Sequence, residues 1–194
     1  MARLAADGDV VRFFDRLYGS IDAGWLEVRG IDLAGQPPKF SVSKWFPIPE
    51  EAKAYREAQA YSKELNGLGY DVFLGVNPRC RGGQEDKDIL SGCALWCDID
   101  GLASVVEAEQ RLEAAQFPLG PDAAVFTGGG IHLYWVLKEP VDPASPDWSI
   151  YLRSLRAMTK LHGGDKQCVN PSRVLRFPLT MSHKRGVQTL LWLK

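Results

Sequence analysis

Two aspartates at the end of one apolar segment have the spacing of a metal-binding pair. Residues 93–100 read CALWCDID, a short apolar run that predicts a strand. Because side chains alternate along a strand, Asp98 and Asp100 are expected on one face, about 6.5 Å apart. Bound cations would relieve the repulsion between two such carboxylates, so the pair suits phosphoryl transfer with two metal ions. The alternative is that both carboxylates are hydrated at a turn before Gly101.

A glycine turn that leads into a histidine is the second candidate for chemistry. Residues 127–132 read TGGGIH and continue into an apolar strand. Glycines allow a ligand to approach the backbone closely, and their amides can bind phosphate oxygens. His132 falls on the same strand face as Gly130 and Tyr134, so it could contact a phosphate or transfer a proton. The alternative is a flexible turn beside a structural histidine.

The third candidate lies in the C-terminal third of the chain. Gly163-Gly164-Asp165 is followed by an extended segment, residues 171–178, that contains two arginines. Asp165 could complete a triad of carboxylates with the two aspartates described above. Arg173 and Arg176 fall on opposite faces of the extended segment and need not bind one ligand. The alternative is that the glycines end a helix and that the arginines are surface charges.

The elements that must position these residues predict an α+β fold with a mixed or antiparallel sheet, because helical and strand patterns are intermixed. Helices are predicted at residues 9–18, 50–65, 104–116 and from 148 onward, with Asp9, Ser104 and Asp147 as N-caps. Strands are predicted within 24–47 as a hairpin with a turn at 35–38, and at 70–76, 93–100, 123–126, 131–137, 174–177 and 189–193. The polar residues 77–92 predict a long surface loop.

Length and composition predict one globular domain outside the membrane. The chain has 194 residues, of which 45% are apolar and 24% charged, and these values exclude fibrous and disordered proteins. Its apolar runs are short, and the N-terminus carries acids where a signal peptide would be apolar, so we expect a cytoplasmic protein. The chain has four cysteines, Cys80, Cys93, Cys97 and Cys168. No two of them are spaced as a CxxC pair, and this favours buried thiols over a zinc site.

The net charge of −1 conceals a segregation of charge along the chain. Taken alone, this value provides no overall field that would attract nucleic acid. Residues 85–122, however, contain nine acids and two bases, whereas residues 153–185 contain eight bases and one acid. A basic C-terminal third beside an acidic segment is the composition expected where a triphosphate and a nucleic-acid backbone lie next to a metal site.

Taken in order, the motifs ALWCDID, TGGGIHLYW, GGD and PSRVLRFPLT, followed by Ser182-His183-Lys184, resemble the archaeo-eukaryotic primase superfamily. The resemblance covers about residues 74–184 and is specific to the primase-polymerase domains of phage, plasmid and mobile-element replication proteins. It implies a catalytic core with an RRM-like sheet, packed against an N-terminal α/β module. We therefore expect a single domain in which residues 1–76 form the module and residues 77–194 form the metal- and nucleotide-binding core.

The resemblance also implies roles for the acids and the histidine. Asp98, Asp100 and Asp165 match the three acids that bind two divalent ions, Mg²⁺ or Mn²⁺, in this superfamily. His132 matches the histidine that contacts the triphosphate of the incoming nucleotide. All the residues needed for the metal site are therefore present.

Basic residues complete the set that the resemblance implies. Arg176 and Lys184 match positions that contact phosphate or template, and Arg173 and Gly130 are further expected phosphate-binding positions. Two residues depart from the pattern of the superfamily: Gly130 stands where many members have serine, and Leu179 stands where glycine is common. The serine hydroxyl is thus missing, and the shape of the loop at Leu179 is in question.

The implied activity is that of a nucleotidyltransferase, a DNA primase and polymerase that copies a single-stranded DNA template from dNTPs or NTPs. Similar domains precede a helical C-terminal primase module or a helicase, so we expect this chain to belong to a larger replication protein. Two other activities use the same residues. One is a metal-dependent nuclease or phosphodiesterase, and the other is a non-catalytic nucleic-acid-binding module of a replication helicase.

Overall fold

Two antiparallel sheets share one apolar core in the computed structural model, which describes residues 3–33, 40–116 and 119–194. Every strand pairing among these residues is antiparallel, and four helices pack on the sheets. The expected α+β fold is therefore confirmed. No helix in these described ranges is both long enough and apolar enough to cross a membrane.

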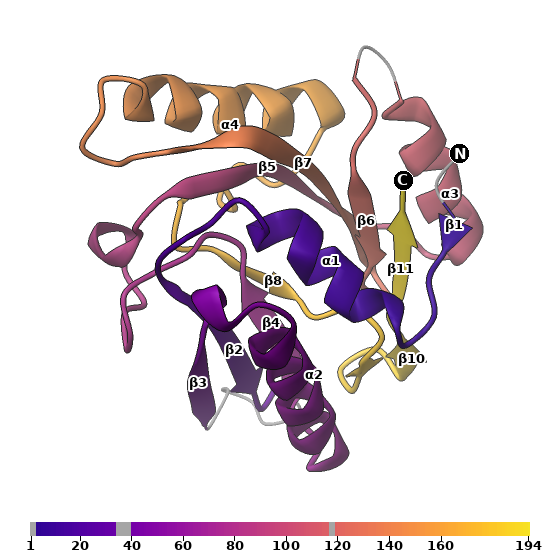
Figure 1. The fold of residues 1–194 in the computed structure, drawn as a ribbon. Coiled ribbons are helices and arrows are strands. Elements are labelled where there is room, and N and C mark those ends of the chain that lie inside the picture. The colour runs from indigo at the N-terminus through magenta and orange to yellow at the C-terminus, as the bar shows by residue number, and fades with distance from the viewer. Residues whose placement is uncertain (1–2, 34–39, 117–118) are drawn as a thin grey trace.

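The first sheet carries the two aspartates. Its strands lie in the order β1 (Arg3–Leu4), β11 (Leu190–Leu193), β6 (Ala123–Phe126), β7 (Gly130–Val141) and β5 (Gly92–Asp100). Along β5, Cys97 and Ile99 turn into an apolar cluster with α3 (Val105–Ala114), so Asp98 faces the other way. Figure 1 shows α4 (Trp148–His162) and α1 (Asp9–Tyr18) on opposite sides of β5 and β7.

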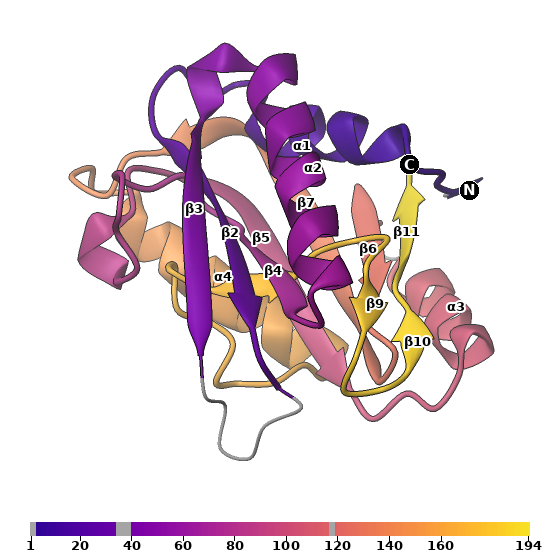
Figure 2. The ribbon, with the colours of Figure 1, turned by 90° about the horizontal axis from the view of Figure 1, so that it is seen from below.

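The second sheet is built mainly from the N-terminal part of the chain. Its strands lie in the order β3 (Ser41–Pro47), β2 (Trp25–Ile31), β4 (Asp71–Gly75) and β8 (Val174–Arg176). Helix α2 (Ala52–Gly67) packs beside β2, β3 and β4, as Figure 2 shows. The remaining elements are a two-stranded hairpin and two 3₁₀ turns: β9 (Met181–Ser182), β10 (Val187–Gln188), η1 (Ile48–Glu50) and η2 (Asp86–Asp88).

Each sheet takes one strand from the opposite end of the chain. The N-terminal strand β1 pairs with β11 in the first sheet, and β8 from the C-terminal third pairs with β4 in the second. The core is shared in the same way, because the rings of Phe14 and Phe177 meet edge to face with centroids 5.4 Å apart. Strands from both sides of the expected boundary at residue 76 thus occur in each sheet. The division into two parts stays a prediction.

The predicted helices are present, with small differences at their ends. Ser104 caps α3 as expected, since its hydroxyl accepts a hydrogen bond from the Glu107 backbone N–H at 3.2 Å. Asp147 occupies the N-cap of α4 but makes no capping hydrogen bond through its side chain. The expected N-cap at Asp9 is wrong: Gly8 is the N-cap, and Asp9 is the first helical residue, whose carboxylate accepts from the Ala6 N–H.

Two loop predictions have different outcomes. The strands on either side of the expected 35–38 turn form the predicted hairpin, and the turn itself lies outside the described residues. Leu179 adopts a φ of 57°, the left-handed conformation that glycine favours. The backbone shape expected of a glycine is therefore kept at a non-glycine residue, at a cost of about 1–2 kcal/mol.

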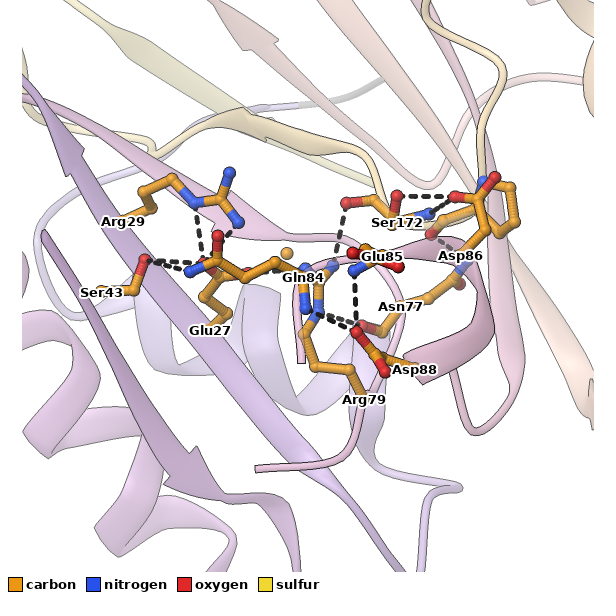
Figure 3. Close-up of polar contacts among 12 residues, drawn as sticks. Glu27, Arg29, Ser43, Asn77, Arg79, Gln84, Glu85, Asp86, Asp88 and Ser172 are labelled. Atoms are coloured by element: carbon orange, nitrogen blue, oxygen red, sulfur yellow. Dashed lines mark hydrogen bonds and ion pairs between the residues drawn. The ribbon is translucent and has the colours of Figure 1, made fainter. Parts of the chain in front are cut away.

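The segment 77–92 is anchored by buried polar residues at its start. Arg79 is fully buried and donates to Glu27 Oε2 at 2.5 Å and to the Ser172 carbonyl at 3.3 Å. Arg29 and Ser43 bind the other oxygen of Glu27, as Figure 3 shows. This cluster ties β2 to the chain that leads into β8. Residues 77–79 of the predicted surface loop are therefore buried, and its exposed residues are 81, 82, 84–87 and 90.

Candidate active site

A cavity of about 220 Å³ is lined by residues of both sheets and of the β9–β10 hairpin. Five of the expected site residues line it: Asp98, Asp100, His132, Arg176 and Lys184. The other lining residues are Leu33, Phe73, Thr127, Gly129 and Arg185. Residues far apart in the sequence thus bring acids and bases to one place.

Asp98 on β5 and His132 on β7 are direct cross-strand partners. His132 Nε2 lies 3.3 Å from Asp98 Oδ1, and the histidine is only 5% exposed. Burial alone would favour the neutral acid, but His132, the Cys168 thiol and the charge of Arg173 outweigh it and lower the pKa of Asp98. Asp98 is therefore an ionised carboxylate in a fixed position. A ligand of a cation has to be deprotonated in this way.

Asp100 lies on the same face at the exposed end of β5. Partial burial, followed by the negative charges of Asp98 and Asp165, raises the pKa of Asp100, while His132 and Arg185 act in the opposite direction. Its carboxylate accepts no hydrogen bond from any residue that the structure describes. The site thus contains like charges that no protein group fully neutralises.

Asp165 reaches the site through the glycine pair that follows α4. Gly163 ends the helix in the left-handed conformation, with a φ of 72°. Gly164 then passes so close to β5 that a Cβ there would lie 2.7 Å from the Asp98 carbonyl oxygen. The Asp165 backbone N–H donates to that same carbonyl at 2.7 Å. The glycines therefore both end the helix and place Asp165 beside Asp98.

The Cys168 thiol joins two of the acids. Its Sγ lies 3.3 Å from Asp98 Oδ2 and 3.3 Å from Asp165 Oδ2. Burial and the charge of Asp98 raise the pKa of this thiol, so it stays protonated and donates. Cys93, Cys97 and Cys168 are buried, as expected, and Cys80 is half-buried.

The glycine turn between β6 and β7 lets backbones approach each other. Gly130 pairs with Asp100, and a Cβ at Gly130 would collide with the Ile99 carbonyl. A serine would not fit there without a shift of the strand, which explains why glycine stands at this position. Thr127 closes the turn, since its N–H and hydroxyl donate to the Gly130 carbonyl at 3.0 and 3.2 Å.

Arg176 lines the cavity but is bound to a buried aspartate. Its guanidinium forms an ion pair with Asp71 and stacks over the Phe73 ring, 4.4 Å from the centroid. Burial lowers the pKa of Arg176, and Asp71 opposes this effect. Asp71 also accepts from the backbone N–H groups of His183 at 3.1 Å and Lys184 at 3.3 Å. Arg176 is therefore part of a cluster that holds the β9–β10 hairpin.

The other basic residues differ in their contacts. Arg173 does not line the cavity; it donates to the Gln167 carbonyl, and its charge acts on Asp98. Lys184 and Arg185 are exposed and line the cavity. The structure thus brings together five predicted site residues, Asp98, Asp100, His132, Arg176 and Lys184. Asp165 and Arg173 lie near Asp98 but outside the cavity lining, and Gly130 is also outside it.

The acids suit a hard divalent cation by their donor chemistry. Asp98, Asp100 and Asp165 offer carboxylate oxygens, the ligands that Mg²⁺ and Mn²⁺ prefer. Their charges already act on one another, as the raised pKa of Asp100 shows. Within the described ranges, no three His, Cys, Asp or Glu side chains are grouped closely enough to form a ligand set. The metal-binding roles of these acids therefore stay a prediction.

The sequence did not predict Asp71, Phe73, Cys168 and Arg185 as residues of this site. The contact between Asp71 and Arg176 joins residues 105 positions apart, and no local pattern reports it. Arg185 had one signal, because it belongs to the basic C-terminal third and follows the Ser-His-Lys motif.

The chain has the fold of primase-polymerase catalytic domains. It matches the AEP domain of the primase-polymerase of cyanophage S-2L with a TM-score of 0.68, at 23% identity over 97% of this chain and 89% of that one. It matches the catalytic domain of primase RepB′, solved in complex with initiator DNA, with a TM-score of 0.62, at 13% identity over 94% of this chain and 83% of that one. The resemblance inferred from the motifs is thus confirmed for the fold.

Sequence comparisons add one relative. A "Replication protein" of Clostridium perfringens is 21% identical over 179 residues, which are 89% of this chain and 40% of that protein. The chain therefore spans well under half of the length of the curated relative that it matches. No family model matches the chain.

Proposed function

We propose that this chain is the catalytic domain of a DNA primase-polymerase, which makes primers on single-stranded DNA and extends them by two-metal nucleotidyl transfer. One observation carries the proposal: like-charged acids and exposed bases line the same cavity. Asp98 and Asp100 provide the acids, and Lys184 and Arg185 provide the bases. The shared fold with primase-polymerases supports this assignment.

The combination of charges distinguishes nucleotidyl transfer from simpler reactions. Acids alone would serve a nuclease, which needs cations and water but no triphosphate. An incoming nucleotide brings several negative charges that cations and basic side chains must neutralise together. The exposed bases beside the acids suit such a polyphosphate, and they favour the polymerase over the nuclease.

The residues of this chain have separate tasks in the proposed reaction. Asp98, Asp100 and Asp165 would hold Mg²⁺ or Mn²⁺. When bound, two such ions activate a 3′-hydroxyl and neutralise the leaving pyrophosphate. His132, fixed by burial and by Asp98, would orient the phosphates, and Lys184 would neutralise them.

The partners follow from this proposal. The template is single-stranded DNA, and the small substrates are dNTPs or NTPs. Because the chain spans 40% of its curated relative, we propose that it acts within a larger replication protein that supplies a helicase or a C-terminal primase module. We expect that protein to act in the cytoplasm.

A primer-synthesis assay tests the function. The protein is incubated with unprimed or primed single-stranded DNA and labelled dNTPs or NTPs, in Mg²⁺ and in Mn²⁺, and the products are separated on gels. We expect dinucleotides and longer products from the unprimed strand. Asp98→Ala with Asp100→Ala should abolish both priming and extension. Arg111→Gln, an exposed substitution on α3, should behave like the wild type.

Each departure from this result has a distinct meaning. Extension without priming would reduce the protein to a polymerase. Extension that persists in the double aspartate variant would overturn the assignment. Shortened DNA in the absence of any added nucleotide would instead identify a metal-dependent nuclease.

A further inference from the structure

The guanidinium of Arg185 lies against the bare backbone of the glycine turn. A Cβ placed on Gly129 would lie 2.9 Å from Arg185 Nε and 3.0 Å from both Cζ and Nη2. A Cβ placed on Gly128 would lie 3.3 Å from Arg185 Cβ. The whole length of the arginine side chain therefore follows the turn. Any other residue at Gly129 would push the guanidinium away.

This position brings the charge of Arg185 to the acids. Arg185 lines the same cavity as Asp98, Asp100 and His132, and its positive charge acts on Asp100. Within the part of the chain that the structure describes, its guanidinium makes no hydrogen bond and no ion pair. Five N–H donors in a planar fork are thus available to a ligand at the edge of the acids.

The other two arginines near the site are bound to protein groups. Arg176 is paired with the buried carboxylate of Asp71, and Arg173 donates to the carbonyl of Gln167. Arg176 is only 7% exposed, whereas Arg185 is exposed. Both arginines expected to bind phosphate are therefore held by protein groups, and Arg185, which was not expected there, offers the free donors.

The hairpin that carries Arg185 is fixed at β9 and at its turn. Asp71 accepts hydrogen bonds from the backbone N–H groups of His183 and Lys184. Asn66 on α2 accepts from the Met181 N–H at 2.7 Å and donates to the Met181 carbonyl at 2.8 Å. The arginine thus extends from a positioned backbone, which reduces the entropy lost when it binds a ligand.

We propose that Arg185, seated on Gly129, binds the polyphosphate of the incoming nucleotide, and that Arg176 positions the hairpin through Asp71. This inference rests on the proposed function, and it assigns a substrate group to one residue. A polyphosphate suits the place better than a template strand, because cations held by the neighbouring acids would attract the same phosphates. An arginine can bind phosphate oxygens with two parallel hydrogen bonds.

Binding of a phosphate series tests the proposal without any chemical step. Titration calorimetry with Mn²⁺ and no DNA compares dATP, dADP and dAMP. We expect Arg185→Gln to weaken dATP binding by about 10- to 100-fold, the loss typical of a charge-assisted hydrogen bond. The same substitution should weaken dAMP binding far less. Arg185→Lys should lie between, and Arg111→Gln should match the wild type.

A double-mutant cycle tests whether the contact between Arg185 and Gly129 matters for binding. Gly129→Ala should displace the end of a flexible side chain and leave the fold intact, so it should weaken dATP binding in the wild type. In the Arg185→Gln background, the same substitution should have little further effect, because the two changes act through one interaction. Thermal melts confirm that each variant is folded. If Arg185→Gln does not fold, Arg185→Lys and Gly129→Ala carry the test.

Three results would overturn the proposal. They are unchanged dATP affinity in Arg185→Gln, an equal loss for dAMP and dATP, and a Gly129→Ala effect that is the same in both backgrounds. The outcome is separable from that of the proposed function. If the wild type makes primers while Arg185→Gln binds dATP normally, only the role of Arg185 fails. If the wild type binds dATP through Arg185 but makes no product, only the proposed function fails.

Discussion

The molecule contains two clusters of charged side chains that differ in how their charges are paired. In the first, Glu27 and Arg79 are both fully buried and are joined at 2.5 Å, with Arg29 and Ser43 on the remaining oxygen of Glu27. In the second, Asp98 and Asp100 lie on one strand face, and the negative charge of Asp98 helps to raise the pKa of Asp100. Opposite charges are paired in the first cluster. In the second, Asp98 is paired with His132, and Asp100 has no ion-pair partner among the described residues.

The difference separates a structural role from a functional one. Buried charges remain in a fold when they are paired and hydrogen-bonded, and Gly75 makes room for Arg79, since a Cβ there would lie 2.6 Å from its guanidinium. Like charges left near solvent lower stability and need another reason to be present. We infer that the first cluster maintains the fold and that the second is kept for a ligand.

The strongest test of this comparison removes the charge from the second cluster. Asp98→Asn with Asp100→Asn should lower nucleotide incorporation by at least about 10³-fold, because the cation ligands are lost. Stability should change little, since the pKa of Asp98 is lowered and that of Asp100 is raised by their surroundings, so the two effects on folding have opposite signs. Product gels and urea unfolding measure the two quantities. A loss of fold together with activity would mean that the acids are structural.

The first cluster should show the reverse behaviour. Arg79→Met leaves one oxygen of the buried Glu27 carboxylate, Oε2, without its partner and should lower the free energy of unfolding by about 3–5 kcal/mol. Arg81→Met in the same segment removes an exposed arginine that lies 5.2 Å from the Trp25 ring centroid, and should cost less than about 1 kcal/mol. Urea denaturation compares the two variants. Equal, small losses would show that the buried pair contributes no more than a surface contact.

The sequence predicted the second cluster better than the first, for a physical reason. Alternation along a strand is local: it places Asp98 and Asp100 on one face of their strand, and His132 with Gly130 and Tyr134 on one face of another. The pairing of these two strands is seen only in the structure. Arg79 sits in a polar segment that reads as a surface loop, and its partner lies 52 residues away. A local pattern cannot report such a contact. The same applies to the ion pair of Arg176 with Asp71, which holds one of the expected phosphate ligands.

Divalent cations provide a smaller test of the same comparison. A ligand that binds only the folded state stabilises it by about 2.7 kcal/mol at a concentration 100 times its Kd. We therefore expect Mn²⁺ to raise the melting temperature of the wild type and of Arg81→Met equally. Asp98→Asn with Asp100→Asn should abolish the rise. A rise that persists in the double variant would place the cation elsewhere.

The smallest expected effect is that of Asp100 alone on the free energy of unfolding, measured in EDTA so that no divalent cation is bound. Its pKa is raised by partial burial and by the charges of Asp98 and Asp165. A raised pKa in the folded state means that the ionised carboxylate lowers stability as the pH rises through that value. Asp100→Asn should therefore stabilise the fold at neutral pH, by less than about 1 kcal/mol because solvent screens an exposed charge.

The pH dependence of that gain distinguishes the charge from other effects of the substitution. Below the ordinary pKa of aspartate, the wild-type carboxyl is protonated in both the folded and unfolded states, so the advantage of Asp100→Asn should disappear. Asp98→Asn should behave in the opposite way, since the pKa of Asp98 is lowered and its ionised form stabilises the fold at neutral pH. Urea unfolding at several pH values measures both. A gain for Asp100→Asn that persists in acid would show that its cause is not the unmatched charge, and the contrast with the Glu27 cluster would then have no electrostatic basis.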